Sequence, residues 1–217
     1  MASGDERVAN LWLAEELWNL GGVQFGDFSL GETVVNSPVY VNLRRLISNP
    51  EALRRAAEVM LAEVQTLQAM RHPHMAPYDL VAGIPLGGLH LATAFSLISG
   101  TPLIYLKPTH NGQAGIIEGV YDAGQRVLII DDLVTGGRSI AYTTTTLQQE
   151  GLLVRDALVL LDRQEGGQAR LKRLGVNLVS LLTLESVLHY LGESHKIPEA
   201  WYHKSLEYLQ RQRRGDR

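Results

Sequence analysis

The stretch "RVLIIDDLVTGGRSI", residues 126–140, carries the most informative pattern in the chain. Four consecutive apolar residues are followed by two aspartates, a Thr-Gly-Gly turn and the beginning of a helical pattern. The short apolar run predicts a buried strand. Because ligands of open parallel sheets bind beyond the carboxyl ends of the strands, Asp131 and Asp132 are expected at the edge of a ligand site.

From residue 79 onward the chain repeats this rhythm of short apolar runs and helical segments. Helical patterns at 87–98, 137–150 and 167–174 separate most of the apolar runs. Such alternation implies crossover connections, and therefore an α/β fold with a parallel sheet covered by helices on both faces. Five buried strands are predicted, at residues 79–84, 102–106, 126–130, 156–161 and 177–182.

The N-terminal part of the chain has a different pattern. Apolar residues at helical spacing predict an amphipathic helix over 5–20, and the alternation in 37–43 predicts a half-buried strand. Asn49 is a capping residue directly before Pro50, so a long helix is expected to begin there. The polar, glycine-rich segment 107–119 is predicted to be a long loop, of the kind that forms lids or binding segments.

Length and composition narrow the class of protein. With 217 residues, of which 45% are hydrophobic, the chain is expected to form a single domain with one substantial core. A net charge of −3 gives no sign of a nucleic-acid-binding or polybasic membrane protein. The absence of cysteine excludes disulfides and thiol catalysis. Because no segment resembles a signal peptide or a membrane span, a cytoplasmic protein is expected.

The loop after the two aspartates has the chemistry of an anion site. Residues 135–139 lead into a predicted helix, whose free N–H groups and dipole attract an anion, and two glycines let a phosphate come close. The carboxylates repel phosphate, but they can accept hydrogen bonds from sugar hydroxyls or hold a hydrated divalent ion. A sugar phosphate therefore fits both halves. One alternative is that the aspartates have only a structural role at the sheet edge. A Walker-B strand of a nucleotide hydrolase is a second alternative, but it would require a G-x-x-x-x-G-K-[ST] loop that the sequence lacks.

Residues 127–139, "VLIIDDLVTGGRS", resemble the phosphoribosyl pyrophosphate (PRPP) binding signature of type I phosphoribosyltransferases. The likeness implies a five-stranded parallel sheet flanked by helices, with an N-terminal hood over the base pocket. The single domain would then consist of an N-terminal helix and hood (1–49), a core (50–192) and a C-terminal helix (193–217). Further segments resemble orotate phosphoribosyltransferases in the same order, at residues 25–50, 81–94, 116–119 and 160–167.

The resemblance implies transfer of the phosphoribosyl group of PRPP to orotate, which gives orotidine 5′-monophosphate and pyrophosphate. It also implies a homodimer and Mg²⁺ as cofactor, bound through PRPP and water without direct protein ligands. Residues 135–139 would bind the 5′-phosphate, and residues 84–88 would face the pyrophosphate. The expected PRPP-binding residues are Ile84, Pro85, Leu86, Gly87, Gly88, Asp131, Asp132, Leu133, Val134, Thr135, Gly136, Gly137, Arg138 and Ser139.

The same resemblance places Arg163, Thr135 and Tyr40 at the orotate pocket. Arg163 lies in "LDRQEGG", directly after a predicted core strand. A planar guanidinium presents a fork of donors that suits a carboxylate, so we expect Arg163 to pair with the carboxylate of orotate. An ordinary surface ion pair is the alternative for this arginine.

The chain departs from the family pattern in its basic residues. Orotate phosphoribosyltransferases typically place a lysine in an "LKSG"-like stretch after the first β region, whereas "LGETVVNSP" has none. A mobile loop that commonly reads "RKxxKDHG" reads "LKPTHNG" here, so Leu106 replaces an arginine, and Thr109 or His110 replaces a second lysine. The segment "GIPLGGL" offers backbone amides but no basic side chain. Several cations that would stabilise a departing pyrophosphate are therefore missing.

Residues 107–117 are predicted to form a lid over the site. The lid would carry the catalytic cations Lys107 and His110, and Asp131 and Asp132 are the other expected catalytic residues. Two further functions stay open. A PRPP- or nucleotide-binding regulator with little catalysis would fit the missing cations, and a phosphoribosyltransferase for another base would fit the signature.

Overall fold

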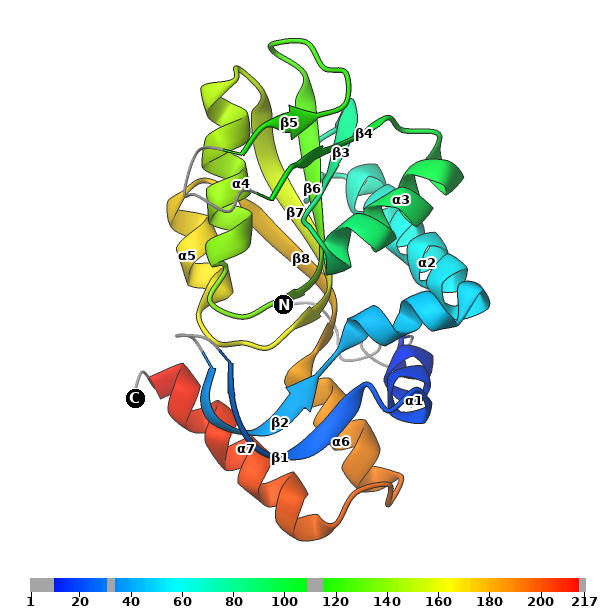
Figure 1. The fold of residues 1–217 in the computed structure, drawn as a ribbon, viewed down its shortest axis with the longest axis vertical. Helices are drawn as coiled ribbons and strands as arrows, with labels where there is room; N and C mark the ends of the chain where they lie inside the picture. Colours follow the sequence, from blue (N-terminus) through cyan, green and yellow to red (C-terminus); the bar gives the residue numbers. More distant parts are fainter. Residues whose placement is uncertain (1–9, 31–33, 109–114, 215–217) are drawn as a thin grey trace.

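A computed structural model describes residues 10–30, 34–108 and 115–214 of the chain. Its central feature is a six-stranded sheet in the order β5-β4-β3-β6-β7-β8 (Figure 1). Strands β3, β4, β6, β7 and β8 pair in parallel, which confirms the five predicted strands, whereas β5 is an antiparallel edge strand within the predicted loop. The strands are β3 (Leu80–Gly83), β4 (Leu103–Leu106), β5 (Ile117–Glu118), β6 (Arg126–Val134), β7 (Leu153–Asp162) and β8 (Asn177–Thr183).

Helices cover both faces of this sheet, as the sequence predicted (Figure 1). In β6, Leu128 and Ile130 belong to one hydrophobic cluster, and Val127 and Ile129 belong to a second cluster on the opposite face. Successive side chains of a strand point to opposite faces, so one apolar run fills both cores. None of the described helices is long and apolar enough to cross a membrane. The covering helices are α2 (Pro50–Ala69) and α3 (Gly87–Ser99) on one face, and α4 (Arg138–Gln149) and α5 (Gly167–Arg173) on the other.

A second group of elements, which we call the hood, lies at the carboxyl end of the main sheet (Figure 1). Its strands β1 and β2 form an antiparallel hairpin, and helices from both ends of the chain pack around this hairpin. The hood therefore joins segments that are far apart in the sequence. It consists of α1 (Leu11–Asn19), β1 (Val23–Leu30), β2 (Val34–Val41), the 3-10 helix η2 (Leu43–Ser48), α6 (Leu184–Glu193) and α7 (Glu199–Arg214).

The boundaries in the hood differ from those predicted. The strand expected at 37–43 begins at Val34 and ends at Val41, because Leu43 already starts the 3-10 helix η2. One C-terminal helix was expected within 193–217, where α7 lies, and a further helix, α6, precedes it. Thr183 caps α6 by accepting a hydrogen bond from the N–H of Ser186 at 3.1 Å. This cap explains a helix start that the apolar pattern alone does not reveal.

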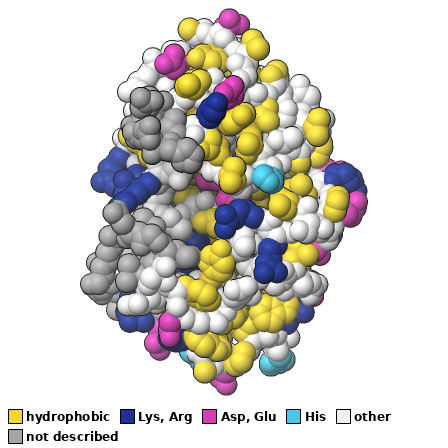
Figure 2. All heavy atoms as spheres, viewed as in Figure 1, with side chains coloured by type: hydrophobic (Ala, Val, Ile, Leu, Met, Phe, Trp, Pro, Cys, Tyr) yellow, Lys and Arg dark blue, Asp and Glu magenta, His cyan; other side chains and the backbone are white. Residues whose placement is uncertain are grey.

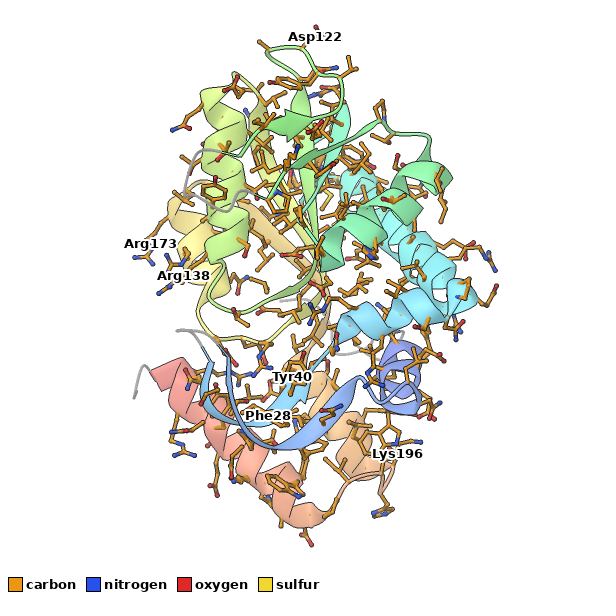
Figure 3. All side chains as sticks on the ribbon, in the orientation of Figure 1. Phe28, Tyr40, Asp122, Arg138, Arg173 and Lys196 are labelled. Carbon is orange, nitrogen blue, oxygen red and sulfur yellow. The ribbon has the colours of Figure 1, made fainter. Side chains whose placement is uncertain are left out.

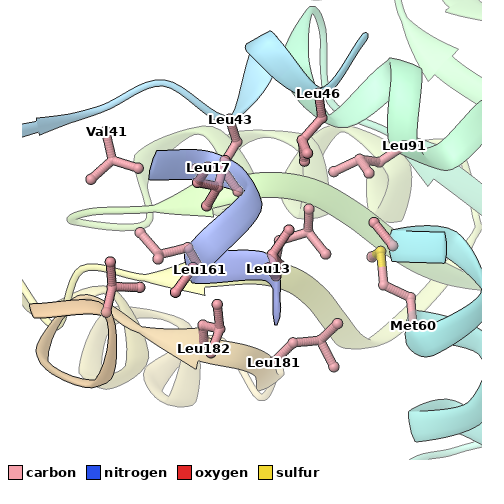
Figure 4. Packing of buried hydrophobic residues seen from close by; sticks show 14 of the residues in the cluster. Leu13, Leu17, Val41, Leu43, Leu46, Met60, Leu91, Leu161, Leu181 and Leu182 are labelled. Atoms are coloured by element: carbon pink, nitrogen blue, oxygen red, sulfur yellow. The ribbon is translucent and has the colours of Figure 1, made fainter. Parts of the chain in front are cut away.

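The hood shares one hydrophobic core with the main sheet. Leu13 and Leu17 of α1 lie beside Leu43 of η2 and Leu161 of β7, all buried in a single cluster (Figure 4). Leu46, also in η2, is only 1% exposed. Because these side chains are packed between both groups of elements, the hood is held in a fixed position over the strand ends.

The start of α2 is bonded to the hood. The side chain of Asn49 accepts a hydrogen bond from the N–H of Ala52 at 3.2 Å, and Pro50 is the first helical residue, which confirms the predicted cap. The same side chain donates to Glu16 of α1 at 2.7 Å. One residue therefore caps α2 and fixes it to the hood.

Candidate active site

The two aspartates lie near the end of β6, beside the carboxyl edge of the sheet. The carboxylate of Asp131 accepts a hydrogen bond from the N–H of Asp132 at 2.9 Å, and that of Asp132 accepts one from the N–H of Leu133 at 2.9 Å. Asp131 is only 7% exposed. Burial, and then the charge of Asp132, raise the pKa of Asp131 well above its usual value. The pair is thus a site of concentrated negative charge that favours hydrogen-bond donors or cations.

The loop at residues 84–88 packs directly on this pair. The N–H of Ile84 donates to the carbonyl of Ile130 at 3.0 Å. A side chain at Gly87 would overlap the carboxylate of Asp132, and a Cβ at Gly88 would lie 2.6 Å from the carbonyl oxygen of Ile130. The approach of the two loops therefore requires glycine, and it brings the first turn of α3 beside the aspartates.

The loop at residues 135–139 opens α4 on the other side of the aspartates. Gly137 has a φ of 72°, a left-handed conformation that favours glycine. A Cβ at Gly167, at the start of α5, would lie 2.6 Å from the carbonyl oxygen of Thr135. The guanidinium Nε of Arg170 in α5 donates to the carbonyl of Gly136 at 2.6 Å. Helix α5 therefore supports the loop from behind.

A cavity of about 280 Å³ lies at this loop, beside the start of α4. Such a helix start offers free N–H groups to an anion. The loop can therefore present such N–H groups to a ligand in this cavity. The cavity is lined by Asp131, Leu133, Val134, Thr135, Gly137, Arg138, Ser139 and Ile140.

A neighbouring cleft of about 340 Å³ joins the main sheet to the hood. Figure 2 shows the surface hollowed between these two parts, with acidic and basic side chains at the hollow. Segments from four separate parts of the chain meet here, including most residues predicted for the site. The cleft is lined by Tyr40, Val41, Asn42, Arg44, Ile84, Pro85, Leu86, Gly87, Asp131, Asp132, Leu133, Thr135, Ser139 and Arg163.

Arg163 lines this cleft but is otherwise enclosed by protein. Its Nε and Nη2 contact one carboxylate oxygen of Glu165 at 2.9 and 2.8 Å. Nη2 also donates to the hydroxyl of Ser37 at 3.1 Å, and Nη1 donates to the carbonyl of Val39 at 3.4 Å. The surface ion pair considered for Arg163 is therefore wrong, because the side chain is 2% exposed and its partner is equally buried.

Glu165 links Arg163 to the C-terminal helix. The hydroxyl of Tyr208 in α7 lies 3.4 Å from the same oxygen of Glu165 that contacts Arg163. Burial raises the pKa of Glu165, although the charge of Arg163 acts in the opposite direction. A buried ion pair of this kind is stable only when it is well bonded. The network therefore couples the cleft to both β2 and α7.

Tyr40 reaches the cleft from the hood. Its ring packs against that of Phe28, with 5.5 Å between the ring centroids, and Figure 3 shows both residues on the hairpin. The guanidinium of Arg44 lies beside the Tyr40 hydroxyl, with 3.5 Å between Nη2 and the oxygen. The predictions missed Arg44, although the paired arginines of "NLRRL" directly after a predicted strand were a usable signal.

The described residues of the predicted lid, 107–108 and 115–117, are not among those that line the cleft. The side chain of Lys107 is 59% exposed and lies 3.7 Å from the carboxylate of Glu118. The N–H of Gly115 donates to the hydroxyl of Tyr142 in α4 at 3.0 Å. His110 and Gly112 lie outside the described residues. Within the described part of the lid, Lys107 is thus bonded within its own loop.

The part of the site that the structure describes has no dense cluster of metal ligands. Among the described residues, no three side chains of His, Asp or Glu come close enough together to hold a metal ion. Asp131 and Asp132 are nevertheless hard oxygen donors of the kind that hold Mg²⁺ through water and substrate oxygens. Burial, and then repulsion by Asp132, raise the pKa of Asp131, and a cation would relieve the repulsion, so the pair fits such an indirectly held ion.

Comparisons with known proteins relate the chain to enzymes of one class. No model of a known protein family matches the chain. Orotate phosphoribosyltransferase of Caenorhabditis elegans is 34% identical over 197 residues, which cover 90% of this chain and 83% of the relative. The structure of Leishmania donovani UMP synthase superposes with a TM-score of 0.82 and 32% identity, covering 94% of this chain but 43% of that protein.

A third comparison concerns a structure with a bound ligand. Orotate phosphoribosyltransferase of Mycobacterium tuberculosis H37Rv, in complex with 5-phospho-α-D-ribosyl 1-diphosphate (PRPP), superposes with a TM-score of 0.62 and 25% identity. The match covers 84% of this chain and 98% of that one. The sheet and helices described above match the type I phosphoribosyltransferase fold that the sequence predicted. The sequence identity, extending over most of both chains, shows that this chain belongs to the orotate phosphoribosyltransferase family.

Proposed function

We propose that this chain transfers the phosphoribosyl group of PRPP to orotate, which gives orotidine 5′-monophosphate and pyrophosphate. The observation that carries the proposal is the meeting of Asp131, Asp132, the loop at 84–88 and Arg163 in one cleft. In this reaction the bond between ribose C1′ and a pyrophosphate oxygen breaks, and a bond from C1′ to a ring nitrogen of orotate forms. The site must therefore hold a sugar phosphate, a leaving group and a base side by side.

The aspartates suit the ribose of PRPP. Ionised carboxylates accept hydrogen bonds, and the ribose 2′- and 3′-hydroxyls can donate them. The ring carbon acquires positive character as pyrophosphate leaves, and two nearby carboxylates stabilise that charge. Asp131 and Asp132 are therefore proposed to orient the ribose and to favour the cation-like transition state.

The two glycine loops suit the two phosphate groups. Residues 135–139 present the start of α4 to the 5′-phosphate, and residues 84–88 present the start of α3 to the pyrophosphate. Backbone N–H groups at helix starts stabilise anions without losing side-chain entropy. Because the loops flank the aspartates, PRPP would bind with its ribose between them.

Arg163 is the proposed partner of the orotate carboxylate, with Tyr40 and Thr135 beside the base. The arginine is already bound to Glu165 through Nε and Nη2, so the orotate carboxylate would meet the Nη1 end of the guanidinium. Burial strengthens such a contact, because the effective dielectric inside a protein is low. This arrangement would favour orotate over uracil, which lacks the carboxylate.

Mg²⁺ is the proposed cofactor, held at Asp131 and Asp132 through water and the oxygens of PRPP. Bound in this way, the ion would supply positive charge to the pyrophosphate. We also propose a homodimer and a cytoplasmic location, both expected from the sequence. Lys107 and His110 are the proposed cations of the lid.

The test mixes purified protein with orotate, PRPP and Mg²⁺ and follows the absorbance of orotate. Loss of orotate absorbance with release of pyrophosphate is expected. PRPP binding without turnover would instead support a regulator. Turnover with uracil or a purine but not with orotate would mean a different base specificity.

A further inference from the structure

The cleft contains a basic side chain to which the sequence analysis assigned no role. Arg44 lies in the first turn of η2, and its side chain lines the cleft together with Asp131, Asp132 and Arg163. Arg163 is neutralised on one edge by Glu165. Arg44 has no carboxylate partner within the part of the chain that the structure describes. The positive charge of Arg44 is therefore the less compensated of the two.

The contacts of Arg44 orient its side chain but use few of its hydrogen-bond donors. Nε donates to the side-chain oxygen of Asn42 at 3.3 Å, and Nη2 lies 3.5 Å from the Tyr40 hydroxyl. Both distances exceed the usual range for N–H···O hydrogen bonds, so both bonds are weak. The neighbouring Arg45 points elsewhere, because its Nη1 donates to the carbonyl of Leu20 at 2.8 Å. Arg44 thus keeps most of its donors available to a ligand.

The backbone that carries Arg44 is held firmly against the site. Leu43 and Leu46, on either side of the two arginines, are 2% and 1% exposed. Helix η2 packs against both α3 and β6, the elements that carry the pyrophosphate loop and the aspartates. Leu86 and Gly87 line the same cleft as Arg44. An anion held at the start of α3 would therefore lie within the space that Arg44 faces.

The chemistry of the proposed reaction favours a basic side chain at this place in addition to the proposed Mg²⁺. Pyrophosphate gains negative charge as it leaves, while Asp131 and Asp132 on the neighbouring strand repel it. The loop at 84–88 has no basic side chain, and Lys107 is not among the residues that line the cleft. We propose that Arg44 binds the pyrophosphate group of PRPP and stabilises the charge that this group gains on leaving. The proposal rests on the proposed function and names one of its binding residues.

Calorimetry with inorganic pyrophosphate and Mg²⁺ tests the contact without turnover. Arg44→Gln is expected to weaken pyrophosphate binding about tenfold or more, the effect of losing a hydrogen bond between charged groups. Arg44→Lys keeps the charge and should bind more tightly than Arg44→Gln. Arg45→Gln is the matched control, since it removes the same charge one residue away, and its pyrophosphate affinity should equal that of the parent. Thermal unfolding of each variant separates these effects from loss of stability.

Kinetics with orotate and PRPP then distinguish a catalytic contact from a structural one. Because the leaving group is most negative in the transition state, Arg44→Gln should lower kcat by about tenfold or more. Orotate affinity should remain unchanged. Equal pyrophosphate affinities of Arg44→Gln and the parent would overturn the proposal, as would a selective loss of orotate affinity, which would place Arg44 at the base. If the parent showed no turnover while the calorimetric difference held, the proposed enzyme function would fall and the anion site at Arg44 would stand.

Discussion

Arg163 and Glu165 form an ion pair in which both side chains are 2% exposed, with 2.8 Å between Nη2 and the carboxylate oxygen. The pair occupies the Nε–Nη2 edge of the guanidinium, and the hydrogen bond that Nη1 makes to the carbonyl of Val39 is long, at 3.4 Å. One edge of the donor fork expected from the sequence is thus taken up by an internal carboxylate, and the Nη1 end is the one proposed to meet orotate. Base recognition would depend on how Glu165 positions the arginine.

The first prediction concerns Arg163→Lys. Lysine keeps a positive charge near Glu165 but lacks the planar fork, so the KM for orotate should rise about tenfold while PRPP affinity stays the same. Arg163→Ala is less informative, because an unpaired buried Glu165 would cost about 3–5 kcal/mol of stability. Steady-state kinetics for orotate and calorimetry for PRPP check this. An equal loss for both substrates would contradict a role at the base.

The second prediction concerns the acidic pair. Replacing Asp131 and Asp132 together with asparagine keeps their shape but removes the charges that accept hydrogen bonds from ribose hydroxyls. PRPP affinity should fall by about 1–3 kcal/mol, and the binding of free orotate should change little. Calorimetry on the folded double variant gives the answer. Unchanged PRPP affinity would show that these carboxylates do not contribute to PRPP binding.

The third prediction concerns the effect of Asp131 on the stability of the folded protein. The pKa of Asp131 in the folded protein is raised well above its ordinary value, chiefly by burial and then by the charge of Asp132. The free energy of unfolding therefore falls as the pH rises from the pKa of Asp131 in the unfolded chain through its pKa in the folded protein. Asp131→Asn does not titrate, so its advantage in Tm over the parent should be largest at neutral pH and shrink towards pH ~4. Thermal scans between these limits test it, and an advantage that grows on acidification would show the opposite shift.

Local patterns explain why part of the site could be predicted from the sequence. A strand end and a tight turn can be recognised within a few residues, from an apolar run followed by aspartates or paired glycines. The loops at 84–88 and 135–139 could therefore be predicted without tertiary information. Arg44 and Arg170 were missed because their relation to the cleft depends on the packing of η2 and α5 against distant segments. The burial of Arg163 depends likewise on β2 and α7, which lie far from it in the sequence.

The fourth prediction tests the contact between the loop at residues 84–88 and the aspartates. Gly87→Ala would place a methyl group against the Asp132 carboxylate, so the loop or the aspartate must move. PRPP affinity should fall about tenfold or more. Gly100→Ala, at the other end of α3, is the control: a φ of 70° makes it costly to stability, but its added methyl meets nothing within 4 Å. If both variants bound PRPP equally, the close approach at Gly87 would not matter for binding.

The fifth prediction assigns Arg170 a positioning role at the loop of residues 135–139. Its Nε donates to the carbonyl of Gly136 at 2.6 Å, which fixes the peptide before Gly137 and so the direction of the N–H groups at the start of α4. Arg170→Gln removes this charged donor, and the loop should then bind the 5′-phosphate less well. We expect PRPP affinity to fall about tenfold, with orotate affinity unchanged.

Arg173 provides the comparison for Arg170, because it belongs to the same helix and carries the same charge. Its Nε donates to the carbonyl of Ala169 within α5 at 3.3 Å, and Figure 3 shows its side chain on the outer side of the helix. Arg173→Gln should therefore leave PRPP binding unchanged. If Arg170 acted only through its charge, raising the salt concentration would remove most of the difference between the two variants, since the Debye length falls to about 3 Å at 1 M. A difference that persists in high salt would show that the hydrogen bond to Gly136 sets the geometry of the loop.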